Sequence, residues 1–330
     1  MSKSLTMYMV QCGVATEVKQ ITSKVWIALT TVYIVWGSTY LGIALVIDSA
    51  PPLTSMGIRF ITAGLILAII LSIFKSKKVM KVKKNELLSS IFLGGLLLGF
   101  GIGNLTLAER YVPSGIAALI IAALPIWVTI FQALVGIKHK KITLIGIFIG
   151  LIGVAIIVLP GGTGPAPGAD PSKVKFWMLM ILIGNIAWAF GTFMTQRIPI
   201  PKYPFVLTSY EMLFGGIALT VAGFIRGEKV NLQVISEMTL TSKWAWVYMV
   251  LIGSIVGYGA YIWLLNNASL SLASTYAYVN PVVAVLLGFL ILSEPLKWPL
   301  FVGGLIILTG VALIVNGERF TSKDLLQKDL

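Results

Sequence analysis

The sequence predicts an all-α integral membrane protein with ten transmembrane helices, arranged as two inverted five-helix repeats. Three observations predict this fold. The chain contains ten apolar stretches of roughly 18–23 residues, and about 20 apolar helical residues cross the hydrocarbon core of a bilayer. The composition is 57% hydrophobic and only 11% charged, with a mean hydropathy of +0.94. The two halves of the chain also share sequence.

Each apolar stretch is predicted to be a helix because backbone amide and carbonyl groups inside lipid must be hydrogen-bonded within the segment. Charged loops separate the stretches, most clearly the Lys-rich segments 75–84 and 138–141 after the second and fourth. The residues before the first stretch are polar and lack the apolar core of a signal peptide, so the first stretch is predicted to be a membrane span. The ten stretches begin at Val25, Leu53, Leu87, Ile116, Ile142, Phe176, Tyr203, Trp244, Leu270 and Trp298.

Basic residues are distributed unequally between alternate loops. With the N-terminus in the cytoplasm, 17 of the 25 basic residues fall in cytoplasmic segments and seven in outer ones, while Arg59 lies inside a helix. Cytoplasmic loops of membrane proteins carry the excess of Lys and Arg. Both termini are therefore predicted to be cytoplasmic, and the net charge of +13 indicates topology and not a nucleic-acid partner.

One Pro- and Gly-rich segment, 161–171, divides the ten stretches into five plus five, and such segments are typical linkers. The predicted regions are a cytoplasmic N-terminal tail 1–24, a first repeat 25–159, an extracytoplasmic linker 160–175, a second repeat 176–315 and a cytoplasmic tail 316–330.

The two repeats match each other in sequence. Segments 143–158 and 300–315 are identical at eight of sixteen positions, where composition alone gives roughly two. Trp36 matches Trp188, and Gly64 matches Gly216. Because each repeat has an odd number of helices, the second inserts upside down, and inverted repeats are the physical basis of alternating access. The pattern favours a secondary transporter over a membrane-embedded enzyme acting on lipid-linked substrates, or a channel.

Five short motifs occur in order along the chain. They are Trp36-Gly37-Ser38-Thr39-Tyr40, Ile58-Arg59-Phe60, Leu124-Pro125-Ile126, Asn280-Pro281-Val282 and Ser293-Glu294-Pro295-Leu296. In this order they resemble the EamA family of the drug/metabolite transporter (DMT) superfamily, and within it the YedA-like exporters. The resemblance covers about 25 to 315 as two EamA units. It implies a ten-helix exporter of small metabolites, amino acids or drugs, with a central cavity between the repeats.

Arg59 and Glu211 are the two ionisable residues well inside the predicted spans. Charges there are unfavourable unless they face protein or water, so each is a functional candidate. They are 152 positions apart, the same separation as between Gly64 and Gly216. In a cavity, Arg59 can bind a substrate carboxylate, and Glu211 can bind a cation or a proton. The alternatives are that Arg59 extends to the outer surface and that Glu211 makes a structural hydrogen bond.

Aromatic residues with polar edges can form the walls of a solute cavity and offer cation–π surfaces, although helix packing or an interfacial belt is the alternative for each. Polar residues in the spans can instead hydrogen-bond between helices. The candidate substrate-binding residues are Trp36, Thr39, Tyr40, Arg59, Trp188, Thr192, Glu211, Tyr258, Tyr276 and Asn280. Pro125 and Pro281 interrupt matching helices and are candidate paired hinges, with a harmless kink as the alternative.

Several chemistries lack support in the sequence. There is no Walker loop, nucleophile triad or metal-ligand cluster, so neither an enzyme activity nor a cofactor is expected. The single histidine, His139, is expected in a solvated Lys-rich loop, and the single cysteine, Cys12, excludes an intramolecular disulfide. The expected partners are a small organic solute, the lipid bilayer and, as an open option, protons. The expected location is the plasma membrane.

The predicted topology can be tested by labelling from outside intact cells. Single cysteines are introduced into a Cys12→Ala background. A cysteine at Thr163, in the linker, is expected to react with an impermeant maleimide, and a cysteine at Lys78 is expected to react only after the membrane is permeabilised. The opposite pattern would overturn the orientation.

Overall fold

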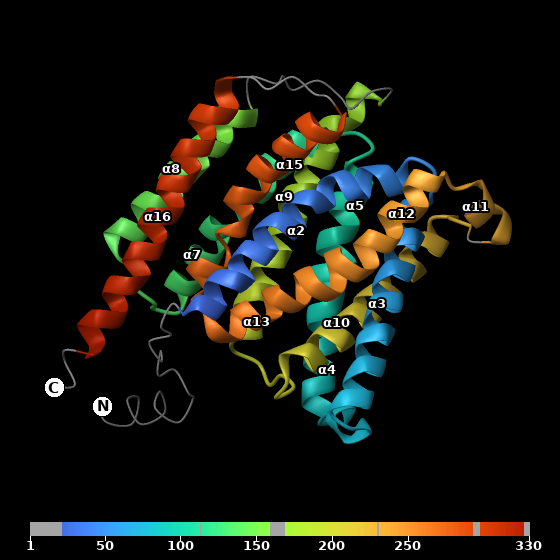
Figure 1. Cartoon of the computed structure of the whole chain (residues 1–330), viewed down its shortest axis with the longest axis horizontal. Coiled ribbons are helices and arrows are strands. Elements are labelled where there is room, and N and C mark those ends of the chain that lie inside the picture. Colours follow the sequence, from blue (N-terminus) through green and yellow to red (C-terminus); the bar gives the residue numbers. More distant parts are fainter. Residues whose placement is uncertain (1–21, 113, 159–168, 230, 293–297, 327–330) are drawn as a thin grey trace.

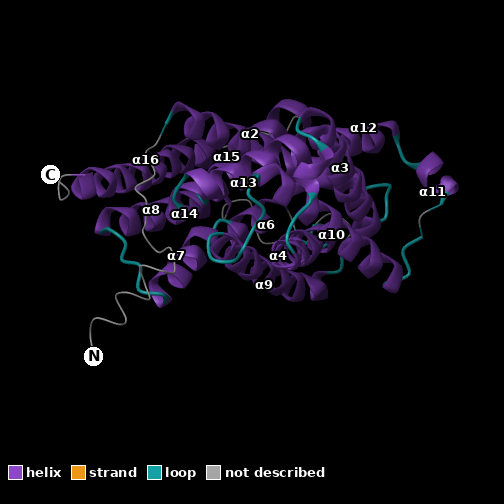
Figure 2. Ribbon diagram, turned by 90° about the horizontal axis from the view of Figure 1, so that it is seen from below, coloured by secondary structure: helices purple, strands orange, loops and turns teal. Residues whose placement is uncertain are grey.

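The computed structural model describes residues 22–112, 114–158, 169–229, 231–292 and 298–326 (Figure 1). Within these ranges every regular element is helical (Figure 2), which confirms the all-α class. In the first half the helices are α2 (Ser23–Ile47), α3 (Pro52–Phe74), η1 (Lys77–Met80), α4 (Lys84–Gly94), η2 (Gly95–Ile102), α5 (Gly103–Ala108), α6 (Ser114–Ile121), α7 (Leu124–Leu134) and α8 (Lys141–Val158).

The second half contains a corresponding set. These helices are α9 (Pro171–Thr195), α10 (Pro204–Ile225), α11 (Leu232–Glu237), α12 (Leu240–Tyr248), η4 (Met249–Tyr258), α13 (Gly259–Asn267), α14 (Leu270–Ala273), α15 (Tyr276–Leu292) and α16 (Trp298–Leu326). We call the side of the bundle where α2 begins face I and the side where α2 ends face II.

Among the residues that the structure describes, six helical segments are long and apolar enough to cross a bilayer. The fourth predicted stretch is divided into α6 and α7, and the ninth into α14 and α15, so the count of ten spans stays a prediction. The six segments are Ser23–Ile47, Pro52–Phe74, Lys84–Ala108, Pro171–Thr195, Pro204–Ile225 and Leu240–Asn267.

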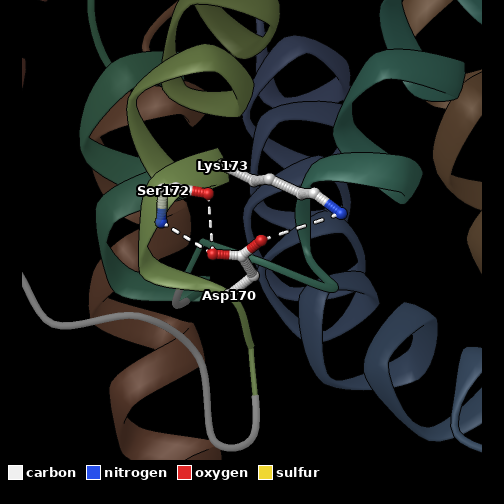
Figure 3. A network of polar contacts seen from close by, with 3 residues as sticks. All are labelled: Asp170, Ser172 and Lys173. Carbon is white, nitrogen blue, oxygen red and sulfur yellow. Dashed lines mark hydrogen bonds and ion pairs between the residues drawn. The ribbon is translucent and has the colours of Figure 1, made fainter.

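Two helices extend past the predicted region boundaries, which stay predictions. The predicted linker ran to 175, but α9 begins at Pro171. The Asp170 carboxylate accepts hydrogen bonds from the Ser172 backbone N–H (2.9 Å) and hydroxyl (2.7 Å), with Lys173 Nζ at 3.8 Å (Figure 3). These contacts, led by the Ser172 hydroxyl, lower the pKa of Asp170, and they cap the helix. At the other end of the second repeat, α16 continues helically to Leu326, beyond the predicted limit of 315.

Matching helices of the two halves pack against each other. Gly57 of α3 faces Gly216 of α10, and a methyl group on Gly216 would lie 2.7 Å from the Gly57 carbonyl oxygen. Gly64 of α3 faces Ser209 of α10, whose hydroxyl donates to the Gly64 carbonyl oxygen (2.9 Å). In the alignment of the two repeats, Gly64 corresponds to Gly216 and Gly57 corresponds to Ser209. Exchanging the halves therefore converts the Gly57–Gly216 pair into the Ser209–Gly64 pair. Residue numbers increase along α3 as they decrease along α10, so these matching helices are antiparallel.

The α8–α16 pair repeats this arrangement. A methyl group on Gly310 would lie 2.8 Å from the Gly146 carbonyl oxygen, and one on Gly153 would lie 2.8 Å from the Gly303 carbonyl oxygen. Gly146 corresponds to Gly303 and Gly153 to Gly310, so these contacts also exchange. Figure 1 shows α8 and α16 side by side at one edge of the bundle. An approximate two-fold axis between antiparallel halves produces this pattern.

The first helix of each half packs mainly against the other half. Helix α2 contacts α15, η4, α12 and α13, while α9 contacts η2, α5, α6 and α7. Each half therefore completes the core of the other, and residues far apart in the sequence meet in the middle of the bundle.

The two candidate hinge prolines lie in different backbone settings. Pro125 occupies the first turn of α7, just after the break at Ala122 and Ala123, where a missing amide N–H removes no helical hydrogen bond. Pro281 lies inside α15, and the break in that stretch comes earlier, at Ser274 and Thr275. The prolines match in sequence but not in their place relative to the breaks, and their hinge role stays a prediction.

Adjacent glycines of the third span provide a matched test of the contact between the halves. A methyl group on Gly94 would lie 2.4 Å from the Glu211 carbonyl oxygen, whereas one on Gly95 would meet nothing within 4 Å. We expect Gly94→Ala to destabilise the protein by about 1–3 kcal/mol through overpacking, and Gly95→Ala to be neutral or stabilising by up to about 1 kcal/mol. Thermal unfolding in detergent measures both, and equal effects would contradict the packing.

Candidate functional site

A cavity of about 90 Å³ lies between the two halves. Its walls come from α2, α3, η2, α5 and α6 of the first half and from α9, η4 and α15 of the second. The lining is mainly apolar and aromatic, as in sites that bind small organic molecules. Eight of the ten candidate substrate-binding residues line it: Trp36, Thr39, Tyr40, Arg59, Trp188, Tyr258, Tyr276 and Asn280.

The other two candidates, Thr192 and Glu211, lie behind this lining. The Thr192 hydroxyl is hydrogen-bonded to the Tyr261 hydroxyl. Glu211 is fully buried, and its Oε2 accepts a hydrogen bond from the Tyr258 hydroxyl (2.9 Å), while its Oε1 has no partner within the described parts of the chain. Glu211 is therefore linked to the cavity through the Tyr258 side chain, which lines it.

Trp36 is the centre of the aromatic cluster. Its ring centroid lies 5.7 Å from that of Trp188, 4.8 Å from Tyr261 and 4.9 Å from Tyr276. Trp36 and Trp188 are matching residues of the two halves, so their edge-to-face contact crosses the approximate two-fold axis. The absence of a side chain at Gly257 allows this placement, because a methyl group there would lie 2.8 Å from Trp36 Nε1.

Arg59 points inward, and not to the outer surface, with only 4% of its side chain exposed. Its Nε donates to the Met249 carbonyl oxygen (3.1 Å) and to the Ser254 hydroxyl oxygen (2.9 Å). The guanidinium also lies over the Phe60 ring, 4.4 Å from its centroid. Among the described residues Arg59 has no acidic partner, so the guanidinium is a buried positive charge that a ligand anion can neutralise.

The Met249 and Ser254 groups that accept hydrogen bonds from Arg59 belong to a π-helix, which residue patterns alone do not reveal. Segments η2 and η4 are both π-helical, lie in matching spans and contribute Leu98, Gly101, Gly253 and Tyr258 to the cavity. A π-helix shifts the backbone hydrogen-bond register and is frequent at functional sites. The Gly-rich sequence of both segments was interpretable only as a helix-packing signal.

Sequence reasoning missed other polar residues near the cavity. Asn185 lines it and donates from Nδ2 to the Ile120 carbonyl oxygen (2.8 Å). Glu109 caps α5 and has both carboxylate oxygens buried. Glu109 directly precedes Arg110 at the end of an apolar stretch, where an acidic residue ordinarily faces water. His139, expected in a solvated loop, is half-buried, and this partial burial lowers its pKa.

The sequence pattern that defines the EamA-like transporter family matches residues 23–159 and 175–316. The chain belongs to the EamA-like transporter family. It is 38% identical over 292 residues to the inner membrane transporter YedA of Escherichia coli (strain K12), covering 88% of this chain and 90% of YedA. A transporter of Archaeoglobus fulgidus is 26% identical over 301 residues, covering 89% of this chain and 99% of its own length.

The fold also has a solved counterpart. A crystal structure with 18% sequence identity superimposes with a TM-score of 0.72, covering 91% of this chain and 99% of that one. At this identity the likeness concerns the fold alone. The family match and the similarity to YedA show a multi-pass membrane transporter built from two EamA repeats, as the sequence motifs predicted.

The contact between Tyr258 and Glu211 can be tested by a double-mutant cycle. Tyr258→Phe leaves the buried Glu211 carboxyl without its donor and is expected to destabilise the protein by about 1–3 kcal/mol. In a Glu211→Leu background the same change is expected to cost about 1 kcal/mol less, because no polar group is then left unpaired. Unfolding in detergent provides the four free energies, and additive effects would show that the two groups act independently.

Proposed function

We propose that this EamA protein is a secondary transporter that exports small amphipathic organic solutes, such as metabolites, amino acids or drugs, by alternating access. The observation that carries the proposal is the cavity between the halves, with Trp36 and Trp188 in contact across the approximate two-fold axis. Two antiparallel halves that exchange conformations open a shared central site to one side of the membrane and then to the other.

Each polar element of the site has a role in this proposal. Arg59 binds an anionic group of the solute, since it has hydrogen bonds to Met249 and Ser254 but no acidic partner within the described ranges. The aromatic cluster around Trp36 packs against the apolar part of the solute. Pro125 and Pro281 provide the bends that open each half.

Glu211 is the candidate for proton coupling in the proposal. Its carboxyl is fully buried and hydrogen-bonded to Tyr258, a residue that lines the cavity. A change in the protonation of Glu211 alters what its oxygens can accept or donate. Tyr258 can transmit that change to the solute site.

The orientation follows from the charge distribution. Basic residues concentrate in the loops that follow α3 and α7, at face I, and the positive-inside rule places this face in the cytoplasm. We therefore propose a plasma-membrane protein with both termini cytoplasmic. The alternatives from other classes are a channel and an enzyme acting on lipid-linked substrates.

Counterflow in proteoliposomes tests the proposal. Purified protein is screened against a panel of metabolites, amino acids and drugs, and at least one solute is expected to show saturable counterflow, which a channel does not give. Glu211→Gln is expected to abolish accumulation driven by a pH gradient while sparing exchange, and the exposed Asp48→Asn is expected to keep both. Unsaturable flux would indicate a channel, and unchanged gradient-driven accumulation would reduce Glu211 to a structural role.

A further inference from the structure

Asn280 of α15 contributes an unsatisfied hydrogen-bond acceptor to the wall of the cavity. The residue lines the cavity and is 2% exposed. Its Oδ1 is buried and has no hydrogen-bond partner among the residues that the structure describes. A buried acceptor without a donor is unfavourable, and an acceptor in the wall of a cavity can obtain its donor from a molecule bound there.

Packing alone does not require an amide at position 280. In the alignment of the two repeats, Asn280 and Pro281 match Leu124 and Pro125. Leu124 is fully buried, so the first repeat fills the matching position with an apolar side chain of similar volume. Asn280 therefore departs from the repeat pattern at a place where the side chain faces the cavity.

Several other polar side chains of the lining already donate hydrogen bonds within the protein. They are Thr39, Asn185, Trp188 and Tyr258. Arg59 keeps a donor free: its Nε bonds to Met249 and Ser254 and its Nη1 to Met56, but Nη2 makes no hydrogen bond within the described ranges. A cationic donor at Arg59 and a neutral acceptor at Asn280 thus remain for a solute.

Trp36 adjoins both of these groups. Its Nε1 donates to the Gly253 carbonyl oxygen (3.3 Å), and a methyl group on Gly253 would lie 3.3 Å from Arg59 Nη2. The centroid of the Trp36 ring also lies 4.9 Å from that of Tyr276. Tyr276 precedes Asn280 by one turn on the same face of α15. The wall of the cavity therefore runs from a cationic group over an apolar ring to a neutral acceptor.

We propose that Asn280 selects, among anionic solutes, those that carry a hydroxyl group at the end remote from the anion. The inference rests on the proposed transport function, in which Arg59 binds the anion, and it names the solute class as hydroxycarboxylates. The hydroxyl donates to Asn280 Oδ1, and the carbon chain packs against Trp36. A hydroxyl fits better than an ammonium, because Arg59 is the one charged side chain in the described lining and an ammonium finds no carboxylate there.

Binding of three acids of equal chain length to the full chain in detergent tests this selection. 6-Hydroxyhexanoate carries the hydroxyl, heptanoate has a methyl group in its place, and 6-aminohexanoate has an ammonium. A site without the acceptor prefers heptanoate, because a methyl group loses no hydrogen bond to water. In equilibrium dialysis at pH 7, we expect the wild-type protein to bind 6-hydroxyhexanoate about tenfold more tightly than either other acid, since a site built to bond a hydroxyl rejects analogues without it.

Two variants locate the preference. Asn280→Leu introduces the side chain that the first repeat carries at the matching position, and it is expected to reverse the order, so that heptanoate binds more tightly than 6-hydroxyhexanoate. Asn266→Leu is the control. It removes an amide that lies outside the cavity lining and donates to the Ile262 carbonyl oxygen (2.8 Å), and it is expected to retain the wild-type order.

A wild-type protein that binds none of the three acids, or binds heptanoate or 6-aminohexanoate as tightly as 6-hydroxyhexanoate, would overturn the proposal. This comparison stays decisive if Asn280→Leu does not fold. A preserved preference for the hydroxyl in Asn280→Leu would overturn it as well. A protein with the expected preference but without counterflow of any solute refutes only the proposed transport function. A protein with saturable counterflow but no preference for the hydroxyl refutes only the selection by Asn280.

Discussion

The architecture depends on direct backbone contact between matching helices of the two halves. Inside lipid there is little hydrophobic drive to associate, so helices adhere through close packing, which small residues permit. The Gly57 carbonyl oxygen packs against Gly216, and the Gly146 carbonyl oxygen packs against Gly310. A methyl group on either Gly216 or Gly310 would lie within 3 Å of that oxygen, so a larger residue does not fit there. Because these contacts exchange when the halves are exchanged, they set the antiparallel relation of the halves and place the cavity between them.

The cavity combines this close packing with local departures from it. The π-helical register of η4 positions the Met249 carbonyl oxygen to accept from both Arg59 and Ser254, so a buried cation is held by neutral groups. Such a cation keeps its charge available to a ligand, whereas an ion pair within the protein neutralises it. The electrostatic character of the site therefore follows from backbone geometry as much as from residue type.

The sequence predicted the helical class, the duplication and eight of the residues that line the cavity, because hydropathy and repeat matches report directly on burial and symmetry. It placed Glu211 among the lining residues, but the structure puts the Tyr258 side chain between Glu211 and the cavity. It gave no indication that the Glu109 carboxylate oxygens are buried. Neither result was predictable, because periodicity defines the face of a helix but not which side chain stands in front of another. The π-helical register is likewise set by tertiary packing and not by composition.

The contact between Trp36 and Trp188 has a special status because it crosses the approximate two-fold axis. A contact across such an axis is its own image, whereas every contact away from the axis has a separate counterpart. Under the proposed exchange of conformations, off-axis contacts trade places between the inward and outward states, but the tryptophan pair keeps the same partner in both. Loss of the mutual tryptophan contact therefore changes the energy of the two states equally, whereas loss of an off-axis contact favours one state over the other. Changes to off-axis contacts can thus alter the populations of the inward and outward states. Changes to the tryptophan contact on the axis can alter how strongly the site holds the solute, without altering those populations.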